Sequence, residues 1–263
     1  MRVITVINAK GGCGKSTIAM NVAAALAGRG LSTLLIDMDP QAQVTQWLGA
    51  GDGLRTEGTL TAAMAGREGF RQVIQQTKIA NLSFVASSEG LEELGRIITE
   101  DETYATILTR LLTADGIGPY DFVVIDSPNQ ISPIMENATY PADVFIVPFE
   151  STKAVKSFAN FYKLLIRLRP DEEHKVLYVL SNLTRQLGLR RRVLQLLKTE
   201  GIPAAQTEVR SCGWLAQVDE HGGSIFEYRP NSKGAVDMSR LTDELVEMLG
   251  SEASRTEPRE VAA

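Results

Sequence analysis

The chain has 263 residues, of which 44% are hydrophobic and 22% charged, a composition typical of a globular protein. That length allows one large α/β domain with a substantial core. There is no run of 18 apolar residues and no basic-then-apolar leader, so the sequence predicts neither a membrane span nor an export signal. Cys13 and Cys212 lie far apart and lack metal-ligand spacing, which favours a reducing, cytoplasmic location.

The formal net charge of −5 is unevenly distributed along the chain. Residues 1–150 carry 10 Lys and Arg against 17 Asp and Glu, and residues 235–263 carry 3 against 7. Residues 151–234 reverse this balance, with 14 against 8. An acidic protein with one basic stretch is expected to present a local surface for anionic partners.

Strand and helix patterns alternate along the chain. Apolar runs without polar alternation, typical of strands buried on both faces, lie at 3–7, 33–36, 82–85, 122–125, 144–147 and 176–180. Helical patterns lie at 16–29, 91–113, 153–168, 190–200 and 236–249. This order predicts a single α/β domain over residues 1–250, with a mostly parallel twisted sheet and helices on both faces. Residues 251–263 form a polar tail that is expected to be disordered.

The loop after the first predicted strand carries the most specific motif, Asn-Ala-Lys-Gly-Gly-Cys-Gly-Lys-Ser-Thr at residues 8–17. Its glycines let consecutive backbone N–H groups point at one spot, and the following helix adds the positive end of its dipole. Lys15 can reach terminal phosphates, and the Ser16 hydroxyl can ligate Mg²⁺. The sequence therefore predicts a P-loop NTPase domain. Its candidate nucleotide-binding residues are Gly11, Gly12, Cys13, Gly14, Lys15, Ser16 and Thr17.

Two residues of this loop depart from the strict phosphate-loop pattern. Ala9 stands where the pattern has glycine, and Lys10 adds a second lysine, which makes the variant more specific than the common motif. Cys13 allows two interpretations. It is either a thiol whose pKa is lowered by Lys15 and the helix N-terminus, or a small residue that fills the loop.

Two further predicted strands end in aspartate. Asp37 and Asp39 follow the strand at 33–36, and Asp126 follows the strand at 122–125. A Mg²⁺ ion that bridges phosphates needs oxygen ligands, usually water held by a carboxylate. Asp37 and Asp39 are two residues apart, which in a strand places them on one face. One of the two could hold metal-bound water while the other orients the attacking water, although aspartate also commonly ends strands at turns.

Together these motifs resemble the ParA/MinD family of deviant Walker ATPases. Residues 10–17 match the family's deviant Walker A motif, residues 37–41 its Walker A′ motif, and residues 123–128 its Walker B motif. The likeness covers most of residues 1–235. It is closest to the small ParA-type proteins, ParF-like and McdA-like, which lack an N-terminal helix-turn-helix domain.

The resemblance implies a set of roles for individual residues. Lys10 would reach across an ATP-dependent homodimer to the partner's phosphates, and Asp39 would position the hydrolytic water, so both are expected to be catalytic. The residues nearest Mg²⁺ would be Ser16, Asp37 and Asp126. Asn182, after the strand at 176–180, sits where the family contacts adenine. The implied cofactors are ATP and Mg²⁺.

The basic stretch predicts a further partner. Clustered arginines suggest sequence-independent binding of a phosphate backbone, and ParA-type ATP dimers bind nucleoid DNA in this way. The candidate residues for double-stranded DNA are Arg190, Arg191, Arg192 and Arg210. The alternative is an ordinary solvated helix face. No membrane partner is expected, because the polar face of the helix predicted at 236–249 is acidic and anionic lipid would repel it.

Two classes of function fit the motifs. The first is a ParA-type ATPase whose hydrolysis is stimulated by a ParB-like or McdB-like partner and which positions a plasmid, a chromosome or a protein organelle such as the carboxysome. The second is a metallocentre-assembly ATPase related to the nitrogenase iron protein. That second class needs cysteines to hold a cluster at the dimer interface, and Cys13 and Cys212 form an inadequate ligand set.

Overall fold

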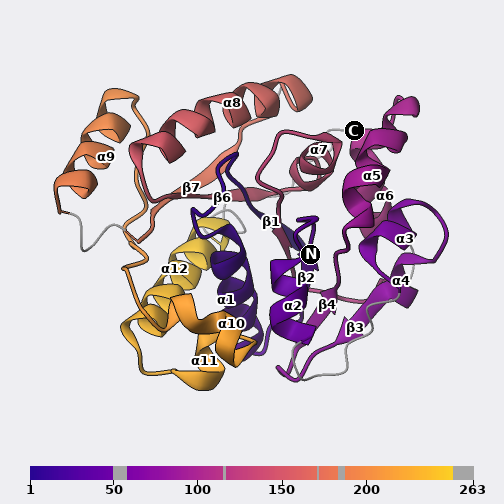
Figure 1. Ribbon diagram of the computed structural model, residues 1–263, viewed down its shortest axis with the longest axis horizontal. Helices are drawn as coiled ribbons and strands as arrows, with labels where there is room; N and C mark the ends of the chain where they lie inside the picture. Colours follow the sequence, from indigo (N-terminus) through magenta and orange to yellow (C-terminus); the bar gives the residue numbers. More distant parts are fainter. Residues whose placement is uncertain (50–57, 115–116, 171, 183–186, 251–263) are drawn as a thin grey trace, which may run out of the picture.

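The computed structural model describes residues 1–49, 58–114, 117–170, 172–182 and 187–250. Seven strands form one sheet in the order β3-β4-β2-β5-β1-β6-β7 (Figure 1). Every strand pair is parallel except β3 with β4. The strands are β1 (Arg2–Val6), β2 (Thr33–Asp37), β3 (Ile74–Gln76), β4 (Leu82–Val85), β5 (Phe122–Asp126), β6 (Val144–Phe149) and β7 (Lys175–Leu180).

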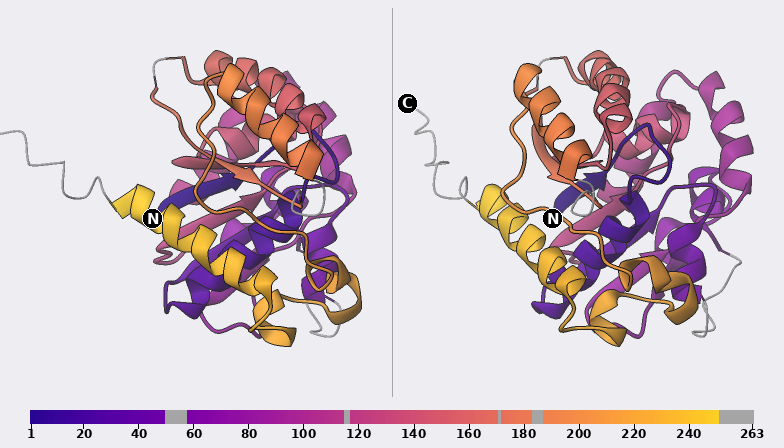
Figure 2. Two further views of the ribbon diagram at one scale, coloured as in Figure 1. Left: turned by 90° about the vertical axis from the view of Figure 1, so that its left-hand side faces the viewer. Right: turned by 60° about the vertical axis from the view of Figure 1, so that its left-hand side comes forward.

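Helices cover both faces of this sheet, as the sequence predicts. On one face, α1 and α12 pack side by side with α10 and α11 at their end, and on the other face α8 and α9 lie over β6 and β7 (Figures 1 and 2). The helices are α1 (Lys15–Gly28), α2 (Gln43–Gly49), α3 (Leu60–Met64), α4 (Phe70–Val73), α5 (Gly90–Ile97), α6 (Ile107–Thr113), α7 (Pro133–Thr139), α8 (Thr152–Leu168), α9 (Leu187–Thr199), α10 (Val218–His221), α11 (Ile225–Tyr228) and α12 (Lys233–Gly250).

The core explains why the strands lack alternation. Side chains of β1, β2 and β5 point alternately into two separate apolar clusters, one under α1 and α12 and the other under α3 to α7. A third cluster packs β6 and β7 against α8 and α9. Because both faces of each central strand are buried, apolar residues are favoured at every position. The parallel arrangement then brings the loops after β1, β2, β5 and β6 to one edge of the sheet.

The expected helix at 91–113 is wrong as a single element. The structure has α5 and α6 with two 3-10 turns between them, Ile98–Glu100 and Tyr104–Thr106. Asp101 explains the interruption, because its Oδ1 accepts hydrogen bonds from both the backbone N and the hydroxyl of Thr103 at 2.8 Å. Such local side-chain bonds compete with helical hydrogen bonding.

The antiparallel strand β3 and the helices shorter than about two turns were also absent from the sequence patterns, because such short elements carry too little periodicity. The predicted tail at 251–263 lies outside the described residues. Within the part of the chain that the structure describes, no helix is long and apolar enough to span a bilayer.

Candidate nucleotide-binding site

The loop between β1 and α1 forms a concave turn at the carboxyl edge of the sheet. Gly12 and Gly14 have φ of 74° and 93°, conformations that L side chains rarely adopt, so glycine is strongly favoured at both positions. Gly14 is the N-cap of α1, and its carbonyl accepts from the Ile18 N–H at 2.9 Å. Lys15 and Ser16 start the helix and are both buried. The helix N-terminus, its free N–H groups and a lysine thus converge on one spot, which favours an anion.

The loop is held in place by hydrogen bonds to its own backbone. The Lys10 carbonyl accepts from Lys15 Nζ at 3.3 Å and from Cys13 Sγ at 3.1 Å, and the Cys13 carbonyl accepts from Ser181 Oγ at 3.0 Å. Burial raises the pKa of the Cys13 thiol, and this effect outweighs the opposing charge of Lys15. The interpretation of Cys13 as an activated thiolate is therefore wrong, and Cys13 fills the loop as a small apolar residue.

Asp126 ends β5 directly beside this loop. It is fully buried, and neither of its carboxylate oxygens has a hydrogen-bond partner in the described structure. Burial and the neighbouring Asp37 raise its pKa well above the usual range, while Ser16 and Lys15 act in the opposite direction. Buried polar atoms are nearly always satisfied, so an orphaned carboxylate points to a missing cation or ordered water. Asp126 and the Ser16 hydroxyl are therefore a fitting pair for a divalent ion.

Asp37 lies next to Asp126 in the sheet register, but both of its carboxylate oxygens accept hydrogen bonds. Its Oδ2 accepts from the Thr45 backbone N at 2.9 Å and from the Thr45 hydroxyl at 2.8 Å, and its Oδ1 accepts from the Asp39 N–H at 3.1 Å. Burial raises its pKa to about 7 against these hydrogen bonds. Asp37 therefore ties the turn after β2 to α2, and a role at the metal has less support than for Asp126.

Asp39 lies beyond the end of β2, so the expectation that Asp37 and Asp39 share one strand face is wrong. The chain turns after Asp37, and Asp39 Oδ1 accepts from the Gln41 N–H at 3.0 Å. The structure nevertheless places Asp39 at the nucleotide edge. It lines a groove of about 800 Å³ together with the loop that follows β5, which includes Pro128 and Asn129.

Lys10 forms an ion pair with Glu150, which follows β6 at the same edge. The Glu150 Oε1 also accepts from the Ser151 hydroxyl at 2.9 Å, and its Oε2 is buried without a partner among the described residues. Sequence reasoning missed Glu150. The available signal was its position, because it directly follows a strand whose carboxyl end was expected at this edge.

A second recess of about 190 Å³ adjoins the other side of the P-loop. Its walls combine Gly12, Gly14 and Thr17 with apolar side chains of the 209–216 segment and α12. Asn182 lies on this wall in a left-handed conformation with φ of 54°, and its N–H donates to the Val209 carbonyl at 2.8 Å. The structure thus places Asn182 beside the P-loop, and its expected contact with adenine stays a prediction.

The two cysteines also line this recess, and both are buried free thiols. In the described part of the chain, no group of three or more His, Cys, Asp or Glu residues is arranged to hold a metal ion. Neither cysteine lies on an exposed surface, so the metallocentre alternative gains no support from their positions.

The four candidate DNA-binding arginines divide into two kinds. Arg190 is paired with Glu208 on the segment after α9. Arg210 forms a bidentate pair with the buried Asp237, with contacts of 2.7–3.1 Å. Arg191 and Arg192 lie exposed on α9, and neither has an ion pair within the described residues.

A parallel sheet with a glycine-rich loop, a buried lysine and strand-end aspartates at one edge defines a P-loop NTPase domain. The family model described as "AAA domain" matches residues 1–176. The chain belongs to this family and, within it, to the ParA/MinD-type P-loop ATPases.

Several relatives are similar over most of the chain. The cell division protein PomZ of Myxococcus xanthus is 29% identical over 94% of this chain and 79% of its own length. The chromosome-partitioning ATPase Soj of Thermus thermophilus is 29% identical over 94% and 96%. The chromosome partitioning protein ParA of Caulobacter vibrioides is 34% identical, but over 57% of this chain and 56% of its own, so the chain spans about half of that relative.

Solved structures confirm the fold. Apo McdA of Cyanothece superimposes with a TM-score of 0.81 at 19% identity, covering 93% of this chain and 99% of that one. Cobyrinic acid a,c-diamide synthase of Mycobacterium smegmatis, with a bound ATP analogue and magnesium, gives a TM-score of 0.80 at 21% identity over 95% and 96%. At such identities the likeness concerns the fold alone.

Proposed function

We propose that this protein is a Mg²⁺-dependent ATPase of the partitioning type, in which ATP binding drives dimerisation and DNA binding and hydrolysis reverses both. The observation that carries the proposal is Asp126, a fully buried carboxylate with two unpartnered oxygens next to Ser16 and the P-loop. Burial raises the pKa of this carboxyl, so holding it ionised in the single chain is costly. A bound cation offsets that cost, so the site is suited to a metal–nucleotide complex.

The residues on the two sides of the P-loop have different proposed roles in binding the nucleotide. The loop amides and Lys15 bind the β- and γ-phosphates, Thr17 binds the α-phosphate, and Asn182 contacts the adenine in the recess of about 190 Å³. Ser16 and Asp126 hold Mg²⁺, directly or through water. Mg²⁺ held there would supply positive charge against the negative charge that develops during phosphoryl transfer. Asp39 orients the attacking water from the opposite side of the site.

Lys10 acts in trans in this proposal. In the single chain its ammonium is paired with Glu150 of the same chain. To reach the phosphates of a second protomer, Lys10 has to leave Glu150, and a doubly charged phosphate group is the stronger partner. Glu150 therefore holds Lys10 away from its own phosphates until a second protomer arrives, which keeps basal hydrolysis low.

The DNA step rests on the basic excess of residues 151–234 and on the exposed Arg191 and Arg192 of α9. A dimer doubles the number of phosphate contacts along one surface, so binding is expected to require ATP and to be independent of DNA sequence. The protein would then associate with the nucleoid. A ParB-like or McdB-like partner stimulates hydrolysis and releases the DNA, and that partner selects the cargo.

Sedimentation velocity and ATPase assays test this function directly. Wild-type protein should hydrolyse ATP slowly with Mg²⁺ and not with EDTA, and it should dimerise with a non-hydrolysable ATP analogue. Asp126→Asn should lose the Mg²⁺ dependence of nucleotide affinity, because the neutral amide cannot hold the metal's water. Asp243→Asn, a surface carboxylate paired with Arg29, is the matched control. Nucleotide affinity that is independent of Mg²⁺ in the wild type would contradict the proposal.

A further inference from the structure

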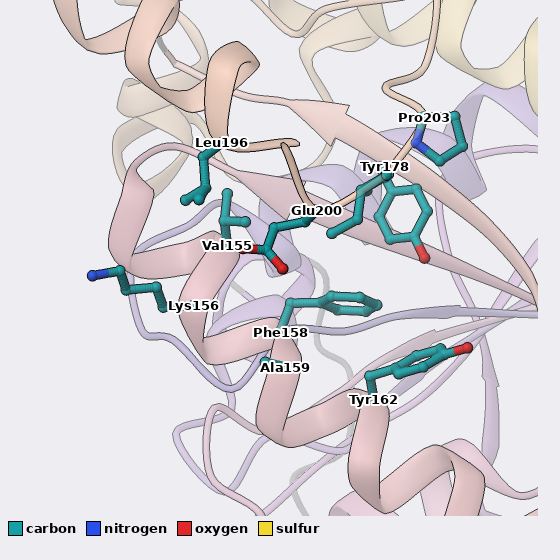
Figure 3. Close-up of a pocket in the computed structure, with 11 residues that line it drawn as sticks. Val155, Lys156, Phe158, Ala159, Tyr162, Tyr178, Leu196, Glu200 and Pro203 are labelled. Carbon is teal, nitrogen blue, oxygen red and sulfur yellow. The ribbon is translucent and has the colours of Figure 1, made fainter. Parts of the chain in front are cut away.

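A recess on the β7 side of the molecule lies apart from the nucleotide site and shares no lining residue with it. Its volume is about 450 Å³, and its walls come from α8, the edge strand β7, α9 and the segment that follows α9 (Figure 3). Val155, Phe158 and Tyr162 face it from successive turns of α8, and Tyr178 faces it from β7. None of the functions proposed above uses this recess.

The aromatic wall of the recess is a cluster of rings that contact one another. Phe158 packs edge-on against Tyr178 with ring centroids 5.2 Å apart, and it contacts Tyr162 with the rings tilted by 40° and their centroids 5.7 Å apart. Behind them Phe149 stacks on Tyr178 at 6.0 Å with an interplanar angle of 9°. Rings that fix one another keep an apolar site open without a ligand, which lowers the ordering cost of binding.

Part of this apolar surface is exposed without a partner. Tyr162 is 42% exposed, and Ile166, one turn further along α8, is 46% exposed. Polar groups sit inside the recess as well. The Glu200 carboxylate points into it (Figure 3), and burial raises the pKa of Tyr178 to about 12, which keeps that phenol neutral. An apolar recess with an acceptor at its wall suits an aromatic side chain that ends in an N–H or O–H donor.

The two helices that line the recess, α8 and α9, carry basic side chains and no acidic ones. Lys156 lines it, but its ammonium points away into solvent (Figure 3). Exposed Lys153 and Lys163 on α8, and Arg192 and Lys198 on α9, have no ion pair within the described chain. Basic partners would be repelled from this surface, whereas acidic chains would be attracted.

We propose that this recess is the docking site for a partner polypeptide in which a tryptophan or tyrosine is flanked by acidic residues. The ring enters between Phe158 and Glu200, where its donor meets the carboxylate, and the flanking acidic side chains face Lys156 and its cationic neighbours. Duplex DNA is a poor occupant because its stacked bases cannot enter a recess of this size. An apolar anchor with a charged rim is the usual anatomy of a binding hot spot.

Fluorescence anisotropy with short synthetic peptides tests the proposal on the full chain. The probe peptide has one tryptophan between aspartates, and two matched peptides carry alanine for the tryptophan or lysine for the aspartates. Ala159→Trp fills the recess from an exposed helix position, and Asn160→Trp, exposed but outside the recess, is its control. We expect wild type and Asn160→Trp to bind the probe peptide but neither of the two matched peptides. The affinity of Ala159→Trp for the probe peptide should be roughly tenfold or more lower.

Lys156→Glu should weaken the probe severalfold and make its affinity less sensitive to salt, because an attractive charge contact is lost. Circular dichroism and nucleotide affinity should match wild type in every variant, since none of these positions touches the nucleotide site. The proposal is overturned if the probe does not bind, if either matched peptide binds equally well, or if Ala159→Trp has no effect. It is also overturned if single-stranded oligonucleotide, rather than the peptide, binds in a manner that requires Tyr162.

Discussion

Two regions of the molecule differ in whether their charged groups have partners within the chain. One is the carboxyl edge of the sheet around the P-loop, called the nucleotide edge, and the other is the surface formed by α9, residues 208–210 and α12, called the flank. At the nucleotide edge, Asp126 is buried with both carboxylate oxygens unpartnered, and Lys15 donates to a backbone carbonyl rather than to an acid. On the flank, Arg190 and Arg210 are each neutralised by a carboxylate of their own chain. The first region is incomplete without a ligand, and the second is largely satisfied without one.

This difference shows what charge in a sequence can and cannot predict. A buried, unpartnered carboxylate is destabilising until a ligand satisfies it, so its presence indicates a binding site. A surface arginine that is already paired must exchange one partner for another, and the net gain is small. The basic excess of residues 151–234 therefore overstates the anion affinity of the flank, because part of it is cancelled locally.

The largest expected effect is on turnover at the nucleotide edge. Asp39→Ala should retain ATP affinity but hydrolyse ATP about 10²–10⁴-fold more slowly, the usual contribution of a positioned acid or base. Steady-state ATPase rates and titration with a fluorescent ATP analogue measure the two quantities separately. Asp243→Ala, on the surface of α12, should leave both unchanged. Undiminished hydrolysis by Asp39→Ala would remove this residue from the reaction.

The next effect concerns nucleotide affinity. Lys15→Ala should weaken ATP roughly 10- to 100-fold, since a hydrogen bond between charged groups contributes about 1.5–3 kcal/mol. Equilibrium titration with the same fluorescent analogue is sufficient. Lys10→Ala is the matched comparison, because it removes the other lysine of the loop and should retain ATP binding. Wild-type affinity in Lys15→Ala would show that the backbone amides alone bind the phosphates.

The Lys10–Glu150 pair gives a smaller effect on association. Lys10→Ala should retain ATP binding and lose the ATP dimer. Glu150→Gln should free Lys10 and raise the dimer association constant roughly fivefold, the equivalent of about 1 kcal/mol for a partly buried pair. Sedimentation velocity with a non-hydrolysable analogue resolves monomer from dimer. An unchanged dimer fraction in both variants would place Lys10 outside the interface.

Much of the fold could be predicted from the sequence because its strands are buried on both faces. Their apolar runs were recognisable without alternation, and the helical patterns at 16–29 and 153–168 match α1 and α8 to within one residue at each end. The break in 91–113 could not be predicted from periodicity, because it depends on hydrogen bonds that Thr103 donates to the Asp101 side chain.

The candidate site, like the fold, could be predicted only in part. Its local parts, the P-loop and the aspartates after β2 and β5, were evident from spacing. The partners that join distant segments were not, since Glu150 meets Lys10 across 140 residues and Asp237 meets Arg210 across 27. Nor could the sequence indicate that Asp37 is satisfied by Thr45 while its sheet neighbour Asp126 is not. Those states are set by the tertiary packing.

The smallest expected effects lie on the flank, where the paired and unpaired arginines can be compared directly. Replacing Arg191 and Arg192 by alanine should weaken ATP-dependent binding to duplex DNA uniformly across sequences. The slope of log affinity against log salt should fall by about 0.9 for each phosphate contact that is lost. Arg190→Ala should change this slope less, because Glu208 already neutralises that guanidinium.

Arg210 should behave differently again, because its partner is buried. In Arg210→Ala, Asp237 loses a bidentate guanidinium and is left as a nearly inaccessible carboxylate, so the melting temperature should fall even without DNA. Arg210→Ala/Asp237→Ala should recover part of that loss while leaving the DNA affinity low if Arg210 contacts phosphate. Anisotropy with two unrelated duplexes, alongside melting curves, separates the two roles. Equal salt slopes in all four arginine variants would show that pairing within the chain does not decide which arginines bind DNA.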